Sequence, residues 1–215
     1  MSQAFFEQNN GKDSTGMPFL KENPVDEVIE MSALNEWFQK GLTVEEYKDQ
    51  MTAHKENMDE VSRQFSLPDD QEFFSELAAR HLRAVVLTED WCGDAMMNNP
   101  VLIALGKAAD VEVRFLLRDS NLELMDQYLT NGRARSIPIF IFIDEEGREV
   151  AKWGPRAKKV QSFVDEARSS LPAKDDPAFK DGQDLLIKHL TSAYVERKDF
   201  WMEVYAELKH TLQTT

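Results

Sequence analysis

Four short apolar stretches, separated by segments of helical pattern, most constrain the fold of this 215-residue chain. They are AVVLT at 84–88, VEVRFLL at 111–117, IPIFIFI at 137–143 and REVAKWG at 148–154. The first of them, AVVLT, is a continuous apolar run, which is typical of a strand buried on both faces of a sheet. Helical patterns at 93–109, 121–132 and 156–170 occupy the remaining positions, so the predicted order is β-α-β-α-β-β-α.

The connections between these stretches predict the domain. Strands joined through helices favour parallel pairing, whereas the DEEG turn at 144–147 joins the last two strands as an antiparallel hairpin. The sequence therefore predicts an α/β domain at 80–171, with a central mixed sheet flanked by helices. Residues 1–79 precede this domain as an N-terminal arm and helical extension, and the arm is expected to be irregular over 1–27. A helical segment, broken near Lys198, follows the domain at 172–215.

Helix signals also appear before the first strand. The spacing of apolar residues predicts a helix that ends before Gly41, with this glycine as a left-handed cap. Thr43 and Glu46 have the spacing of a capping box, which predicts a helix start. The pattern that follows predicts one continuous helix that carries Tyr47 and Met58 on the same face.

Composition excludes several classes of function. A net charge of −14 disfavours nucleic acid and anionic membranes as partners, because both require clustered cations. No run approaches the roughly 20 apolar residues that cross a bilayer, and the first residues do not resemble a secretory signal. The four histidines are scattered, so no metal site is predicted. A single cysteine excludes an intrachain disulfide, which favours a cytoplasmic location.

That cysteine, Cys92, stands between the first predicted strand and the helix that follows. Backbone N–H groups at a helix start lack partners and the helix dipole is positive there, so a thiolate is stabilised. Asp94 acts in the opposite direction, because its carboxylate disfavours a second negative charge nearby. Gly93 permits close approach of another backbone, and Trp91 is expected to flank the sulfur. These residues leave two outcomes open, a reactive thiol and an inert buried one.

Residues 83–170 resemble the thioredoxin family at four separate points. Trp91-Cys92-Gly93-Asp94-Ala95 is similar to the family motif Trp-Cys-Gly-Pro-Cys, with Asp94 and Ala95 in place of the proline and second cysteine. Pro100 matches the helix-kinking proline, Ile137-Pro138 matches the Ile-Pro segment, and 142–166 resembles the closing hairpin and last helix, with Gly154 at its glycine. The resemblance implies a thioredoxin-like fold in which Pro138 is a cis-proline opposite Cys92. It also implies that backbone groups of Ile137 bind an extended peptide or a glutathione-like backbone.

Two departures from the family change the expected chemistry. Ala95 cannot resolve a mixed disulfide, and Val86 replaces the buried aspartate that the resemblance implies as a proton acceptor. The predicted function is therefore thiol–disulfide exchange through Cys92 alone, on a disulfide-bearing protein or a small-thiol substrate. Arg133 and Arg135 are candidates to hold the carboxylates of a low-molecular-weight thiol, and no other cofactor is predicted. The alternative for both arginines is a solvated loop.

Two further interpretations stay open. In one, the protein is a redox-inactive binding or adaptor module of thioredoxin fold, and Cys92 has no chemical role. In the other, Cys92 and a bound thiol hold an iron–sulfur cluster between two subunits, which resembles some monothiol glutaredoxins. This third interpretation ranks last, because the motif at 91–95 matches theirs poorly.

Overall fold

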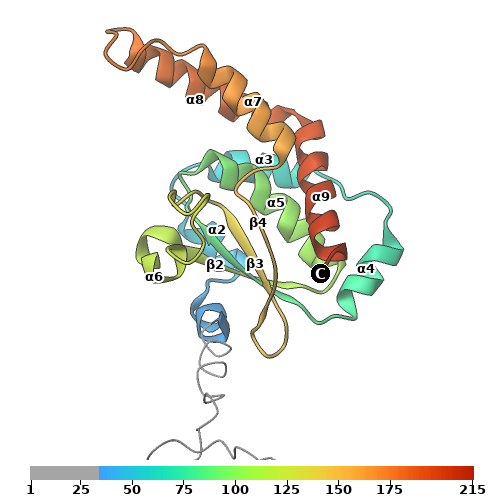
Figure 1. Ribbon diagram of the computed structural model, residues 1–215. Coiled ribbons are helices and arrows are strands. Elements are labelled where there is room, and N and C mark those ends of the chain that lie inside the picture. The colour runs from blue at the N-terminus through green and yellow to red at the C-terminus, as the bar shows by residue number, and fades with distance from the viewer. Residues whose placement is uncertain (1–33) are drawn as a thin grey trace, which may run out of the picture.

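The computed structural model describes residues 34–215, so the predicted arm at 1–27 lies outside the described residues (Figure 1). The four strands are β1 (Arg83–Thr88), β2 (Glu112–Leu117), β3 (Ile139–Ile143) and β4 (Glu149–Trp153), in the sheet order β2-β1-β3-β4. The helices are α2 (Val44–Gln50), α3 (Lys55–Gln64), α4 (Gln71–Ala78), α5 (Gly93–Ala108), α6 (Leu122–Met125), α7 (Lys158–Ser169), α8 (Phe179–Glu196) and α9 (Lys198–Gln213). Residues 34–40 are also helical. The predicted α/β class and the order β-α-β-α-β-β-α are confirmed.

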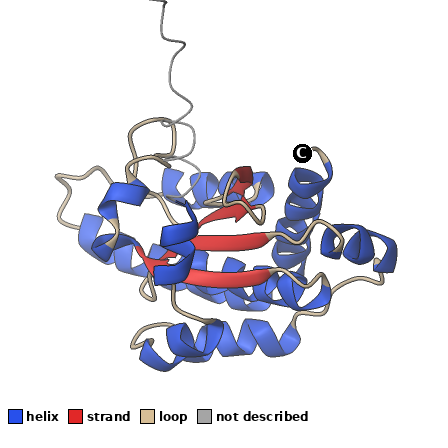
Figure 2. Cartoon of the chain, turned by 90° about the horizontal axis from the view of Figure 1, so that it is seen from below, coloured by secondary structure: helices blue, strands red, loops and turns tan. Residues whose placement is uncertain are grey.

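The sheet buries both of its faces, as its apolar strands predict (Figure 2). Successive residues of β1 alternate between two apolar clusters: Ala84 and Val86 face one, and Val85 and Leu87 face the other. Side chains of α3, α4, α5, α7 and α9 fill the first cluster. Cys92 belongs to the second, smaller cluster, together with residues of α6 and of the helical segment 34–40.

The direction of β3 corrects the prediction of parallel pairing through helices. β1 pairs in parallel with β2, but β3 is antiparallel to β1, with Leu87 opposite Ile139. The chain leaves β2 and enters β3 at the same end of the sheet, so the connection 118–138 need not cross the sheet. Within this connection, the helix expected at 121–132 is reduced to the single turn of α6. Asn131 and Gly132, both with positive φ, lie in the turns that follow.

The N-terminal helices confirm one prediction and correct two. The Thr43–Glu46 capping box is present, with both of its hydrogen bonds. Gly41, however, is not left-handed: a Cβ there would lie 2.6 Å from Cβ of Arg114, so the glycine allows close approach to β2. The expected single helix is two helices, because the chain turns at His54, whose φ of 53° is left-handed.

The C-terminal helices share the main core with the sheet. The chain breaks at Arg197, next to the predicted Lys198, and α9 lies alongside α5 (Figure 1). Its buried face carries Phe200, Trp201, Val204, Tyr205, Leu208 and Leu212. Asp70 is the N-cap residue of α4, but its side chain does not cap the helix. Its carboxylate instead accepts hydrogen bonds from Tyr205 (2.7 Å) and Lys209 (2.5 Å) of α9. The C-terminal segment is thus fixed to the domain by packing and by polar contacts.

Candidate functional site

The sheet register brings Cys92 and Pro138 together. Cys92 is the N-cap residue of α5, four residues beyond the end of β1. Pro138 directly precedes β3, which pairs with β1 at the same end of the sheet. The Cys92 thiol donates a hydrogen bond of 3.4 Å to the carbonyl oxygen of Ile137. Two residues 45 positions apart in sequence are therefore in direct contact at the start of a helix.

The Ile137–Pro138 peptide bond opposite the sulfur is cis, and a second cis bond, Gly154–Pro155, follows β4. The second was not predicted from the sequence. Gly154 adopts a φ of +129°, and a Cβ at this position would lie 2.2 Å from the carbonyl oxygen of Pro138. Only glycine has both the conformational freedom and the small size that this contact requires. The Gly154 backbone thus supports the turn that faces Cys92.

The environment of Cys92 favours the neutral thiol. The side chain is 8% exposed, and burial raises its pKa to about 12. The Asp94 carboxylate contributes to this rise, whereas backbone N–H groups of Asp94 and Ala95 and the Arg156 guanidinium act in the opposite direction. Desolvation and the Asp94 carboxylate, which raise the pKa of Cys92, outweigh the backbone N–H groups at the helix start, which lower it. The sequence leaves this balance open, and burial together with the Asp94 carboxylate turns it toward the neutral thiol.

Asp94 is buried and paired. Its side chain forms a double hydrogen bond with Arg156, with Nε–Oδ1 and Nη2–Oδ2 distances of 2.5 and 2.6 Å. The Tyr194 hydroxyl donates a third bond of 2.8 Å to Oδ1. Arg156 and Tyr194 lie 62 and 100 residues from Asp94 in the sequence, and no spacing signal could have linked them. We refer to Asp94, Arg156 and Tyr194 as the Asp94 cluster.

Trp91 forms the exposed side of the site. Its ring is 48% exposed, and the guanidinium of Arg118 stacks on it with a distance of 4.9 Å to the ring centroid. Arg118 also donates to the carbonyl oxygen of Arg135 at 3.1 Å. The residues around 118 and 135 are thus joined beside the Ile137–Pro138 turn.

The two candidate arginines for a small thiol differ in their contacts. Arg135 binds Asp126 through both Nε and Nη2, at 2.6 and 2.8 Å, which compensates its charge. Arg133 is exposed, and among residues 34–215 its side chain forms no ion pair. Arg133 is therefore the better placed of the two to meet a carboxylate from solution.

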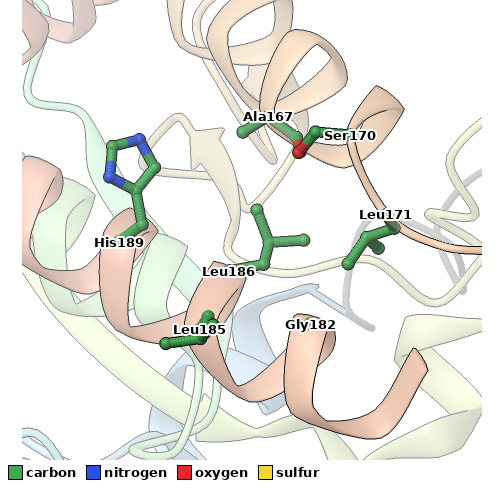
Figure 3. A pocket seen from close by; sticks show the side chains of 7 residues that line it. All are labelled: Ala167, Ser170, Leu171, Gly182, Leu185, Leu186 and His189. Atoms are coloured by element: carbon green, nitrogen blue, oxygen red, sulfur yellow. The ribbon is translucent and has the colours of Figure 1, made fainter. Parts of the chain in front are cut away.

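Other features of the described chain add no second reactive centre. No group of three or more His, Cys, Asp or Glu side chains within residues 34–215 could hold a metal ion. None of the helices described there is long and apolar enough to span a membrane. A hollow between α7 and α8 is lined by Ala167, Ser170, Leu171, Gly182, Leu185, Leu186 and His189 (Figure 3). This lining is mostly apolar, and Ser170 and His189 are its polar side chains.

Comparison with known proteins decides the family. A family model described as thioredoxin matches residues 41–168, more than half of the chain. The chain belongs to the thioredoxin family. The match includes Cys92, Pro138 and Arg156, whereas Tyr194 of this thioredoxin-family protein lies beyond it. No curated protein matches the chain.

Two solved structures resemble this thioredoxin-family protein in fold. The crystal structure of an HIV epitope scaffold has a TM-score of 0.61 at 16% identity, covering 84% of this chain and 98% of its own. A protein of unknown function from Pseudomonas aeruginosa has a TM-score of 0.53 at 19% identity, covering 75% of this chain and 93% of its own. At these identities the likeness shows the fold alone. It agrees with the thioredoxin-like arrangement of a four-stranded mixed sheet between helices.

Proposed function

We propose that this protein carries out thiol–disulfide exchange with Cys92 as its sole sulfur nucleophile. The observation that carries the proposal is the 3.4 Å contact between the Cys92 sulfur and the Ile137 carbonyl oxygen, at the N-cap of α5. A backbone carbonyl beside a sulfur is a suitable anchor for an extended substrate, because main-chain hydrogen bonds give affinity without demanding a particular side chain. The thioredoxin family membership supports the same assignment.

The proposed reaction needs an external thiol. In the first step the Cys92 thiolate attacks one sulfur of a substrate disulfide, a mixed disulfide forms, and the other substrate sulfur leaves as a thiolate that takes up a proton. Ala95 offers no second sulfur, so the thiolate of a low-molecular-weight thiol attacks the mixed disulfide and Cys92 is released. A second molecule of the small thiol reduces the adduct left on the substrate. The small thiol thus supplies both electrons.

Arg133 is the residue proposed to orient that small thiol. Arg133 is exposed and precedes Ile137 by four residues in the sequence, and guanidinium–carboxylate pairs combine charge with a fixed geometry. Thiols that carry carboxylates are therefore proposed as better reductants than neutral ones. The proposed location is the cytoplasm, where small thiols are kept reduced.

One observation favours a second candidate function, a binding module without redox chemistry. Because burial raises the pKa of Cys92 to about 12, the side chain is a neutral thiol at pH 7, whereas the thiolate is the attacking species. In this second function the surface around Trp91 and Ile137 binds a partner, and Cys92 is a small apolar residue of the second cluster.

The two functions differ in whether Cys92 enters a disulfide in the folded protein. Native protein is incubated with an excess of an oxidised small disulfide such as oxidised glutathione, and its intact mass is measured over time. Exchange predicts one adduct on the wild type and none on Cys92→Ser. The same incubation in denaturant is the control that the reagent is competent. An adduct that forms only in denaturant would sink the exchange proposal and leave the binding module.

A further inference from the structure

The C-terminal helices reach the site through Tyr194 of α8. The hydroxyl of this buried tyrosine donates to Oδ1 of Asp94 at 2.8 Å, two residues from Cys92 in the sequence. Its ring covers Gly93, where a Cβ would lie 3.7 Å from two ring carbons. The Trp201 indole N–H of α9 donates to the Tyr194 carbonyl oxygen at 2.8 Å, so the backbone that carries Tyr194 is itself held.

Arg156 approaches Asp94 from a loop that is fixed on both sides. Asn98 of α5 donates to the Pro155 carbonyl oxygen at 2.9 Å, immediately before Arg156. Two residues after Arg156, the Lys158 backbone N–H donates to Glu207 of α9 at 2.7 Å. The third guanidinium nitrogen of Arg156, Nη1, donates to Gln161 at 3.0 Å. The guanidinium therefore meets the carboxylate in a geometry set by α5, α7 and α9.

We propose that Arg156 and Tyr194 are positioning residues for Cys92: they hold the Asp94 carboxylate at the start of α5 and thereby set the net charge that the sulfur meets. This inference rests on the proposed role of Cys92 as the reacting group. Asp94 and Arg156 have opposite charges, so removing either one changes the field at the sulfur in opposite directions. Tyr194 adds no charge and acts through the orientation of the carboxylate.

Other titratable groups near Cys92 are already engaged elsewhere. The Tyr47 hydroxyl of α2 lies 3.4 Å from the Thr88 hydroxyl oxygen. The Glu89 carboxylate accepts from the Asp119 backbone N–H at 2.8 Å. The Asp90 carboxylate accepts bonds from residues 52 and 53 at 2.7 and 3.0 Å. Asp94 raises and Arg156 lowers the pKa of Cys92, so the Asp94 cluster places opposite charges near the sulfur.

The chain contains a matched control for this cluster. On α9, Tyr205 and Lys209 donate to the Asp70 carboxylate at 2.7 and 2.5 Å. The Asp70 cluster therefore has the same composition, a carboxylate with a cation and a tyrosine hydroxyl, but it joins α9 to the start of α4. Substitutions there remove the same kinds of bond without changing the surroundings of Cys92.

The test measures the rate of Cys92 alkylation by iodoacetamide against pH, by intact mass, in the full-length protein. Asp94→Asn is expected to accelerate alkylation at pH 8 about tenfold, and Arg156→Gln to slow it about tenfold, which corresponds to about one pKa unit in each direction. Tyr194→Phe keeps the ring and both charges, so a smaller slowing of about threefold is expected. Asp70→Asn and Tyr205→Phe are expected to match the wild type.

Opposite shifts at Asp94 and Arg156 distinguish positioning from a merely structural role, because loss of structure exposes the thiol and accelerates alkylation in every variant. Near-UV circular dichroism at each pH confirms that a variant is folded. If Arg156→Gln does not fold, the isosteric Asp94→Asn and the conservative Tyr194→Phe decide the question. If the alkylation rates of Asp94→Asn and Tyr194→Phe follow pH as those of the wild type do, the inference is overturned. Shifted alkylation without any mixed disulfide in the oxidised-glutathione incubation would instead reject the proposed function, and only the effect of the Asp94 cluster on the acidity of the sulfur would remain.

Discussion

Gly154 packs directly on the carbonyl oxygen of Pro138, so the residue that follows β4 supports the turn that faces the only thiol of the chain. A Cβ at position 154 would lie 2.2 Å from that oxygen, closer than any van der Waals contact allows. The backbone at Gly154 also has a φ of +129°, which residues with a side chain rarely adopt. Both constraints act on one residue, and both can be tested with one substitution.

Gly154→Ala is expected to lower the free energy of unfolding by about 3 kcal/mol, because it combines the clash with an unfavourable φ. Gly132→Ala is the matched control: its φ is +66°, but nothing lies within 4 Å of the added Cβ. The control is expected to cost about 1 kcal/mol, from φ alone. Urea denaturation measures both, and equal losses would show that the Pro138 contact carries no energy.

The stability of the protein is expected to fall at alkaline pH through Cys92. Burial raises the folded-state pKa to about 12, above the unfolded value of about 8.5. Between the two pKa values the unfolded chain binds fewer protons at Cys92 than the folded chain does. The free energy of unfolding is therefore unaffected below the unfolded pKa and falls as the pH rises from there to the folded pKa. The slope approaches about 1.4 kcal/mol per pH unit. Urea denaturation from pH 7 to 10.5 would detect it, and Cys92→Ser should lack this component. Identical profiles in the two proteins would contradict the raised pKa.

Trp201 is expected to contribute strongly to the shared core. Its side chain is 1% exposed, so Trp201→Ala should cost about 3–5 kcal/mol through lost burial and a residual cavity. The neighbouring Met202 is 39% exposed on the same helix, and Met202→Ala should cost less than about 1 kcal/mol. Thermal and urea unfolding of both variants provide the measurement. Similar losses would mean that α9 is only loosely attached to the sheet.

Arg133→Gln is expected to slow reduction of the Cys92 mixed disulfide by a carboxylate-bearing thiol several-fold, since one ion pair is worth about 1 kcal/mol. The rate with uncharged 2-mercaptoethanol should not change, which separates carboxylate binding from access to the sulfur. Arg135→Gln provides a comparison, because Arg135 is already paired with Asp126. Equal slowing with both thiols would argue against a carboxylate contact at Arg133.

Much of the fold follows from local signals in the sequence. Apolar runs identify all four strands, the Thr43–Glu46 pair identifies the start of α2, and the break between α8 and α9 falls one residue from Lys198. The direction of β3 could not be read in this way. An alternation of strands and helices does not say whether a connection crosses the sheet or stays at one end.

The candidate site was predictable only in part, for the same physical reason. The position of Cys92 at the start of α5 is local, and a strand followed by a helix identifies it. The contacts that determine its charge are not local, because Arg156 and Tyr194 reach Asp94 from the loop after β4 and from α8. The extent of desolvation around the sulfur depends on packing of the second cluster, which no single segment encodes.

The bond between Tyr194 and Asp94 has a consequence for any attempt to isolate the thioredoxin unit. A fragment cut to residues 41–168 would keep the cysteine, the aspartate and the arginine, but the start of α5 would lose its phenol and its covering ring. Water would enter beside the sulfur, and the pKa of Cys92 would differ from that in the intact chain. The reactivity of Cys92 in such a fragment would therefore not represent its reactivity in the full-length protein.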